Sequence, residues 1–357
     1  MNVLSGGLQS IQKCAAILRS GGILAIPTET VYGLAANAFD EAAAARIFTA
    51  KDRPTFDPLI VHIPSGWGSL RRLDELGITE SAVLSPQART VAESLMKAFW
   101  PGPFTLVLPR GPKIPDIVTS GLTTVGVRMP RHAITQDLLR TLQLPLAAPS
   151  ANRFGRISPT TTSAVSAELS GRVEFVLEGG PCEIGLESTI VHVAPDATLT
   201  LLRPGAVSRE ELEAATGSTV RVAEKSITEK STAELAPGML ASHYAPSKRL
   251  VLGAAGEFQA LRNASPGTRW GVLLFDPASV PAVGSPSLLE VLAPDADWAG
   301  AARRLFGILR KMDESAEVDR IFAEDPGTTT LEKKSQGIAA AILDRLTRAA
   351  APRQGAH

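Results

Sequence analysis

The feature that most constrains the fold is an apolar run that a proline stops and a polar cluster follows. Residues 22–26 form a short apolar run of the kind that makes a buried strand. Pro27 ends this strand because proline cannot donate to a sheet ladder, so the polar residues 28–30 lie where the strand gives way to a loop. Ligands bind at that end of the strands in open α/β sheets. The pattern therefore predicts an α/β fold with a functional site near residues 28–30.

A helix and a second strand follow this polar cluster. Residues 40–50 are rich in alanine and predict a helix, and Lys51 and Arg53 stand where that helix runs out before a proline. Residues 59–63 predict another strand, which ends near His62. One short segment thus brings two hydroxyls, a carboxylate, two cations and an imidazole close to strand ends.

The rest of the first half alternates between short apolar runs and amphipathic runs. Strands are expected at 104–108, 123–129, 146–148, 173–177, 189–193 and 199–202, and helices at 8–18, 79–99, 134–142 and 160–169. The helix at 79–99 is expected to begin at Thr79 or Ser81, and the helix at 160–169 at Ser158 or Thr160. This alternation predicts a twisted mixed sheet with flanking helices.

The composition changes after residue 217, where the chain becomes polar as far as residue 247. A polar segment of this length indicates a linker or a functional loop. Beyond it a second α/β pattern begins, with strands expected at 250–252, 270–275, 288–292 and 319–323 and helices at 298–312 and 331–346. We therefore expect a catalytic domain at 1–217, a linker or lid at 218–247, a smaller Rossmann-like α/β domain at 248–348 and a tail at 349–357.

The charge balance and the cysteine count exclude several classes of protein. Lysine plus arginine and aspartate plus glutamate both number 36, which argues against a strongly basic nucleic-acid-binding protein. The two cysteines are too few for a disulfide framework. The sequence shows neither a leader pattern nor an apolar run of transmembrane length, so we expect a cytoplasmic protein without a membrane partner. The five histidines are widely spaced and form no zinc motif, so no protein-held metal is expected.

The candidate anion-binding residues are cationic side chains at the ends of predicted strands and helices. Neither the P-loop pattern nor the Gly-x-Gly-x-x-Gly pattern occurs, so a nucleotide would have to be held in another way. Lys51, Arg53, Arg128 and Arg203 each stand at a strand or helix end next to proline or glycine. A single arginine is more often part of a surface salt bridge, but an arginine at such a stop can present its planar guanidinium to phosphate or carboxylate.

Three strings together resemble one family signature. They are Pro27-Thr-Glu-Thr-Val-Tyr-Gly-Leu34, Lys51-x-Arg53 and Pro58-Leu-Ile-Val-His62. The combination resembles the signature of the YrdC-like family, the L-threonylcarbamoyl-AMP synthases. The string His243-Tyr-Ala-Pro246 is similar to the linker motif of the long form of this family, so the resemblance extends over nearly the whole chain.

The resemblance implies a set of site residues. The implied catalytic group is Lys51, Arg53, Ser150 and Asn152; the implied L-threonine-binding residues are Thr30, His62, Arg128, Ala148 and Ser188; and the implied ATP contacts are Arg53, Asp57, Thr124, Ser150, Ser158 and Arg203, with Tyr244 closing over the nucleotide. The family commonly has asparagine where this chain has Asp57, and a carboxylate there would repel phosphate.

The resemblance also implies the reaction and its partners. A nucleotidyltransferase of this family combines L-threonine, bicarbonate or CO₂ and ATP into threonylcarbamoyl-AMP and pyrophosphate, with Mg²⁺ bound mainly through the phosphates. A downstream tRNA threonylcarbamoyl transferase would use the product to make N6-threonylcarbamoyladenosine, so tRNA contact is expected to be indirect or weak. Two alternatives stay open at this point. One is a nucleic-acid-binding module, and the other is a carbamoyl-transfer domain like that of hydrogenase-maturation proteins. A purely structural role for the C-terminal domain is also open.

Overall fold

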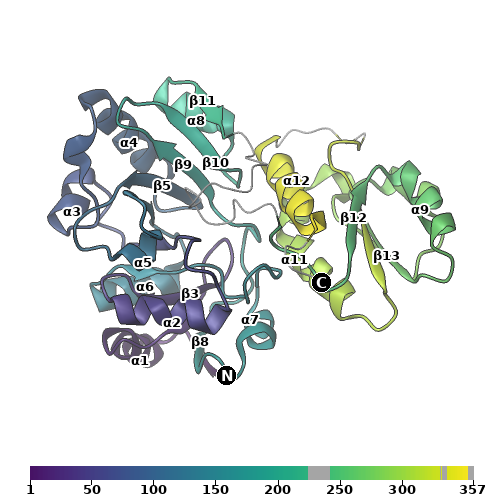
Figure 1. Ribbon diagram of the computed structural model, residues 1–357, viewed down its shortest axis with the longest axis horizontal. Coiled ribbons are helices and arrows are strands. Elements are labelled where there is room, and N and C mark those ends of the chain that lie inside the picture. The colour runs from purple at the N-terminus through teal and green to yellow at the C-terminus, as the bar shows by residue number, and fades with distance from the viewer. Residues whose placement is uncertain (224–241, 330, 332–335, 353–357) are drawn as a thin grey trace. The chain divides into compact units, whose positions relative to one another are not determined.

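The computed structural model describes residues 1–223, 242–329, 331 and 336–352 (Figure 1). Two compact units emerge from it. The first takes in residues 1–154 and 159–183 and continues from 187 up to the gap in the description. The second takes in 155–158 and 184–186 as well as the C-terminal part of the chain. Two short segments from the middle of the sequence therefore fold with the C-terminal unit.

The first unit is built on a mixed sheet. Among the described residues its strands lie in the order β1 (Asn2–Leu4), β8 (Phe175–Leu177), β2 (Leu24–Ile26), β3 (Gly33–Asn37), β7 (Leu146–Ala147), β4 (Ile60–His62), β6 (Thr124–Arg128), β5 (Phe104–Pro109), β9 (Thr189–Val193), β10 (Leu199–Arg203) and β11 (Val220–Val222). Neighbouring strands are parallel in some pairs, such as β4 with β6, and antiparallel in others, such as β5 with β6. The predicted mixed sheet is confirmed.

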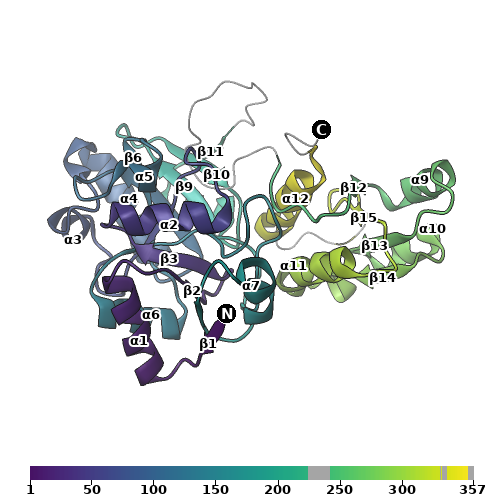
Figure 2. The ribbon, with the colours of Figure 1, turned by 60° about the horizontal axis from the view of Figure 1, so that its bottom comes forward.

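Helices cover both faces of this sheet. They are α1 (Leu8–Arg19), α2 (Glu41–Lys51), α3 (Leu70–Glu75), α4 (Pro86–Phe99), α5 (Asp116–Thr119), α6 (Ala133–Leu142), α7 (Thr162–Leu169) and α8 (Arg209–Thr216). Helices α1 and α6 lie side by side and share one apolar core with β2 (Figure 2). The apolar faces of α2, α3, α4 and α7 build a second and larger core. The strand ends between these cores are held in place by close packing.

The expected helix at 79–99 is shorter in the structure. A 3₁₀ turn, η1 (Ser81–Val83), comes first, and α4 begins at Pro86. Ser85 caps it by accepting a hydrogen bond from the amide of Ala88, so the prediction of a cap at Thr79 or Ser81 is wrong. Both of those hydroxyls instead donate to the carboxylate of Asp74. Proline at the first helical position and serine before it fit the amino-terminal preferences of helices.

Some elements were missed or misplaced by the sequence patterns. Strand β3 lies in an alanine-rich string without strand periodicity, and its pairing with β2 overrides that composition. Helix α7 is capped by Thr161 rather than by Ser158 or Thr160. Strand β11 pairs with β10 inside the segment expected to be a linker from residue 218, so the sheet continues beyond residue 217.

The second unit is a smaller α/β fold. Its parallel sheet has the order β12 (Leu250–Gly253), β15 (Arg320–Glu324), β13 (Trp270–Leu274) and β14 (Leu288–Val291). Its helices are α9 (Phe258–Ala264), α10 (Val280–Val283), α11 (Trp298–Glu314) and α12 (Gln336–Ala350), with the short turns η2 (Ala255–Glu257), η3 (Pro277–Ser279) and η4 (Pro294–Ala296). The expected smaller α/β domain is confirmed, and its sheet is parallel. In the described part of the chain no helix has the length and apolarity that crossing a membrane requires.

Candidate functional site

Several candidate residues stand at the ends of elements of the first unit. Lys51 is the last residue of α2, and His62, Arg128 and Arg203 are the last residues of β4, β6 and β10. In the sheet His62 pairs with Arg128, and Arg128 pairs with Thr105 of β5. Paired residues on neighbouring strands point to the same face. An imidazole, a guanidinium and a hydroxyl therefore form one row across the sheet.

Lys51 is buried and holds the Ser-x-Asn segment. Its ammonium donates to the backbone carbonyl of Ser150 at 2.5 Å and to that of Asn152. The amide of Phe154 returns a hydrogen bond to the Lys51 carbonyl at 2.8 Å. Burial, followed by the charge of Arg53, lowers the pKa of Lys51 well below its usual value. The lysine therefore fixes the backbone of the segment that carries the Ser150 and Asn152 side chains.

Arg53 is enclosed by its own loop. Its Nε donates to the Asp57 carbonyl at 3.1 Å and its Nη2 to the Pro58 carbonyl at 2.9 Å. The same Nη2 lies 2.8 Å from a carboxylate oxygen of Asp57. Burial raises the pKa of Asp57, while the charges of Arg53, Lys51 and Arg203 oppose that rise. The loop thus places a buried carboxylate among three cations.

A buried ion pair organises the polar cluster after β2. One Nη2 proton of Arg128 is donated to the carboxylate of Glu29 at 2.7 Å, and Nη1 donates to the Thr30 hydroxyl at 2.9 Å. The second carboxylate oxygen of Glu29 accepts from the amide of Arg131 at 3.0 Å. Burial would raise the pKa of Glu29, but the charge of Arg128 and these hydrogen bonds hold it below its usual range. Glu29 therefore fixes the orientation of the Arg128 guanidinium.

His62 is a neutral imidazole. Its Nδ1 lies 3.1 Å from the carbonyl oxygen of Ile60, which can only accept, so Nδ1 carries the proton. Burial, and then the nearby charge of Arg128, lower the pKa of His62 to about 3. The amide of Ala148 donates to the same Ile60 carbonyl at 2.9 Å. In this tautomer the second ring nitrogen, Nε2, carries no proton.

Ser188 and Arg203 form a second buried cluster. Arg203 donates through Nη2 to the Ser188 hydroxyl at 3.1 Å and through Nε to the Ser188 carbonyl at 3.0 Å. The Ser188 hydroxyl also lies 2.7 Å from the hydroxyl of Thr105. Arg203 is therefore no surface salt bridge, and it orients a hydroxyl in the row that contains Arg128.

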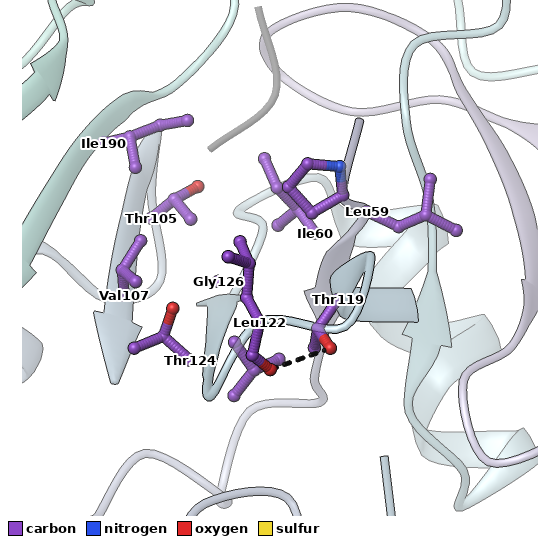
Figure 3. Close-up of a pocket in the computed structure, with 11 residues that line it drawn as sticks. Leu59, Ile60, Thr105, Val107, Thr119, Leu122, Thr124, Gly126 and Ile190 are labelled. Carbon is purple, nitrogen blue, oxygen red and sulfur yellow. Dashed lines mark hydrogen bonds between the residues drawn. The ribbon is translucent and has the colours of Figure 1, made fainter. Parts of the chain in front are cut away.

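A small hollow opens over the middle of the sheet (Figure 3). Its lining is apolar with several hydroxyls, and includes Pro58, Leu59, Ile60, Thr105, Val107, Thr119, Leu122, Thr124, Val125, Gly126 and Ile190. Gly126 lines the hollow, and a Cβ there would lie 3.4 Å from the Thr105 side chain, an ordinary van der Waals contact. Apolar walls with a few placed polar groups are typical of small-molecule sites.

The structure brings most of the predicted site residues together in the first unit. Lys51 contacts Ser150 and Asn152, Thr30 contacts Arg128, and Thr124 lines the hollow. The predicted ATP contacts Ser158 and Tyr244 belong to the second unit instead. There the Tyr244 ring stacks on Phe306 and lies 5.3 Å from the Arg345 guanidinium. Their nucleotide contacts stay predictions.

The list of site residues that the resemblance implies leaves out Glu29 and Thr105. Glu29 lies inside the recognised string, but nothing in the string shows that it pairs with Arg128, 99 residues away. Thr105 is a hydroxyl in a strand that is otherwise apolar, and that contrast is the one signal that could have found it. Both residues act through partners that lie close only after folding.

Comparison with known proteins gives matches over both units. The family described as "Telomere recombination" matches residues 16–205, and "Threonylcarbamoyl-AMP synthase, C-terminal domain" matches residues 207–351. A Bacillus subtilis protein named threonylcarbamoyl-AMP synthase is 38% identical over 98% of this chain and 95% of its own. A Pyrococcus abyssi protein of the same name is 37% identical over 95% of this chain and 93% of its own.

Solved structures agree with these matches. The crystal structure of P. abyssi Sua5 complexed with L-threonine has a TM-score of 0.83 and 34% identity to this chain, and the match covers 98% of both chains. A variant of the same archaeal protein, with an adjacent histidine and tyrosine replaced by alanine, has a TM-score of 0.82 over 98% of this chain.

Proposed function

We propose, from the premise that this chain belongs to the threonylcarbamoyl-AMP synthase family, that it makes threonylcarbamoyl-AMP from L-threonine, bicarbonate or CO₂ and ATP and releases pyrophosphate. The observation that carries this function is the match over 98% of the chain with a relative whose structure contains L-threonine. The row of Arg128, His62 and Thr105 with the Ser188 hydroxyl beside it supplies the groups that such a substrate needs.

The amino-acid subsite is proposed to lie at Arg128. A guanidinium has five N–H donors, and in the described part of the chain three are used, by Glu29, Thr30 and the Gly102 carbonyl. The two remaining donors suit the substrate carboxylate in a bidentate pair. Neutral His62 would accept from the substrate through Nε2, and the hydroxyls of Thr30 and Ser188, together with Ala148, would suit the threonine side chain.

The nucleotide subsite is proposed around the remaining cations. Lys51, Arg53 and Arg203 would neutralise the phosphates, with the Ser150 and Asn152 side chains orienting reacting oxygens and Thr124 lining the hollow. The threonine amine forms a carbamate, either with CO₂ and loss of a proton or with bicarbonate and loss of water. A carbamate oxygen then bonds to the α-phosphorus as the bond to pyrophosphate breaks. Positioning and charge stabilisation are the main requirements of such a transfer.

Mg²⁺ is proposed to arrive with ATP. The described residues contain no group of three or more His, Cys, Asp or Glu side chains that could hold a metal ion. Phosphate oxygens and water, which Mg²⁺ prefers, would then supply its ligands.

The decisive assay compares L-threonine with valine. The full chain is expected to release pyrophosphate with L-threonine, bicarbonate and Mg-ATP, and at least ~100-fold more slowly with valine, because a site that hydrogen-bonds a substrate hydroxyl is left with unpaired groups by an analogue without one. Omission of bicarbonate or addition of a chelator provides the background rate. Comparable rates with valine would contradict the threonine subsite, and no release with either amino acid would contradict the activity.

We further propose that the product serves tRNA modification in the cytoplasm. A tRNA threonylcarbamoyl transferase would consume the mixed anhydride, and direct tRNA binding would be weak because the net charge of the chain is zero. Transfer of label from threonine to tRNA should therefore require the added transferase. Tight, salt-sensitive binding of tRNA to this chain alone would favour the nucleic-acid-binding alternative.

Residues 1–217 are proposed as the catalytic domain, although 155–158 and 184–186 fold with the second unit. Residues 218–247 are proposed as a linker that acts as a lid, although β11 at its start extends the first sheet. Residues 248–348 are proposed as the accessory domain and 349–357 as a tail. Most of the lid lies outside the described residues. Its described end contains Tyr244, which is buried within the second unit at a left-handed backbone position with φ of 61°. A lid would exclude water from a product that hydrolyses readily.

The lid predicts a nucleotide contact of the Tyr244 hydroxyl. Tyr244→Phe keeps the ring on Phe306 and is expected to weaken ATP binding about tenfold, the effect of one lost hydrogen bond. Calorimetric titration with ATP measures this, and Phe306→Leu serves as a packing control that lowers the melting temperature without the same loss of affinity. An unchanged ATP affinity in Tyr244→Phe would show that the ring only packs.

A further inference from the structure

Asp57 is an unusual group for a site that receives phosphates. Its side chain is wholly buried, and neither carboxylate oxygen has a hydrogen bond among the described residues. One of these oxygens lies 2.8 Å from the Nη2 of Arg53. Buried carboxylates normally accept several hydrogen bonds. The Asp57 carboxylate is instead stabilised by the electrostatic attraction of the Arg53 guanidinium.

The charges around Asp57 come from three parts of the first unit. Arg53 belongs to the same loop, Lys51 ends α2 and Arg203 ends β10, and all three act on the Asp57 carboxylate. The Asp57 carboxylate therefore stands among basic groups from three elements. The next residue, Pro58, lines the hollow that also contains Thr124. The Nη2 of Arg53 donates to the carbonyl of Pro58, so a polyanion in this hollow would approach the guanidinium that Asp57 now neutralises.

We propose that Asp57 is an internal counter-anion that neutralises Arg53 while the site is empty and takes up a proton when the ATP triphosphate replaces it. This inference rests on the proposed function, since it assumes that ATP binds at Arg53. It reverses the expectation that Asp57 contacts ATP as the family asparagine does. The carboxylate stabilises the empty protein and weakens ATP binding.

The proposal fixes the sign of the pH dependence. A nearby triphosphate disfavours the ionised carboxylate, because like charges raise the pKa of an acid. The complex then holds more protons than the free protein, so ATP affinity falls as pH rises between the pKa of Asp57 in the free protein and its higher value in the complex. Lys51 could also gain a proton on ATP binding, because burial lowers its pKa.

One substitution separates these two sources of proton uptake. Asp57→Asn removes the carboxylate, and it also removes a charge that raises the pKa of Lys51. Proton uptake should therefore fall in Asp57→Asn if Asp57 is the source, and stay the same or grow if Lys51 is the source. The ionisation of ATP itself is common to both proteins and cancels in the comparison.

The experiment is calorimetric titration of the full chain with ATP in buffers of different ionisation enthalpy, together with melting temperatures. Asp57→Asn is expected to bind ATP about tenfold more tightly, because the repulsion between two close like charges is removed, and to lose the proton uptake. Its melting temperature without ATP should fall and should recover with ATP. Asp74→Asn is the matched control, because Asp74 accepts hydrogen bonds from Thr79 and Ser81 and lines no part of the hollow.

The control Asp74→Asn is expected to have a lower melting temperature than the unmodified chain. Its ATP affinity and its proton uptake on ATP binding are expected to be unchanged. Unchanged or weaker ATP binding in Asp57→Asn, or an undiminished proton uptake, would overturn the counter-anion role alone. Failure of the unmodified chain to bind ATP would overturn the nucleotide subsite and this inference with it.

Discussion

Replacement of Lys51 by methionine is expected to lower turnover by about 10²-fold or more, the usual effect of removing one preorganised charge contact. Two losses contribute in this protein. The ammonium that would neutralise phosphate disappears, and the carbonyls of Ser150 and Asn152 lose the donor that fixes their segment. Methionine keeps the volume of the buried side chain, so the core that surrounds α2 stays filled.

Steady-state pyrophosphate release and circular dichroism test this expectation together. Lys97→Met is the control, because Lys97 is an exposed lysine in the last turn of α4 and should change neither activity nor fold. Arg53→Ala is expected to cause a loss of similar size through its phosphate contact. A folded Lys51→Met protein with near-normal turnover would remove Lys51 from the catalytic group.

Replacement of Arg128 by glutamine is expected to act on substrate binding and on stability at once. The proposed bidentate contact with the threonine carboxylate is lost, so the KM for L-threonine should rise by ~10²-fold, in line with the loss of a buried charged hydrogen-bond pair. Glu29 is left buried without its cation, which costs about 3–5 kcal/mol of folding free energy.

A second substitution separates the two effects. Glu29→Gln in the Arg128→Gln background removes the uncompensated charge and should recover much of the stability, which denaturant unfolding measures. It should not recover the KM, because the carboxylate contact stays absent. Recovery of threonine use in the double variant would show that Arg128 serves the fold rather than the substrate.

Local signals predicted the elements whose ends carry the site. Pro27 marks the end of β2, and Asp40 caps α2 by accepting a hydrogen bond from the amide of Ala43. Residues next to each boundary therefore determine where these elements end or begin. The partners of the side chains are not local. Arg128 meets Glu29 and Thr30 only through the register of the sheet, and Ser188 meets Thr105 across 83 positions.

The same reasoning explains the misread elements. The alanine-rich sequence of β3 lacks the alternation of apolar and polar residues that is typical of a strand. It forms a strand because it pairs antiparallel with β2. The cap of α4 lies at Ser85 because Pro86 fits the first helical position, while Thr79 and Ser81 turn to the Asp74 carboxylate. A family resemblance names the residues of a site, whereas hydrogen-bond partners require coordinates.

The segments 155–158 and 184–186 belong to the second unit, which limits how the two units of this enzyme can be expressed separately. The Ile157 carbonyl accepts from Arg310, and Arg156 pairs with Asp313 at 3.2 Å. The Gly155 carbonyl accepts from the amide of Ala245. A gene cut within 218–247 would strip these partners from a segment that begins three residues after Asn152. Because residues 155–158 and 184–186 fold with the C-terminal part of the chain, no single cut in the sequence yields the two units intact.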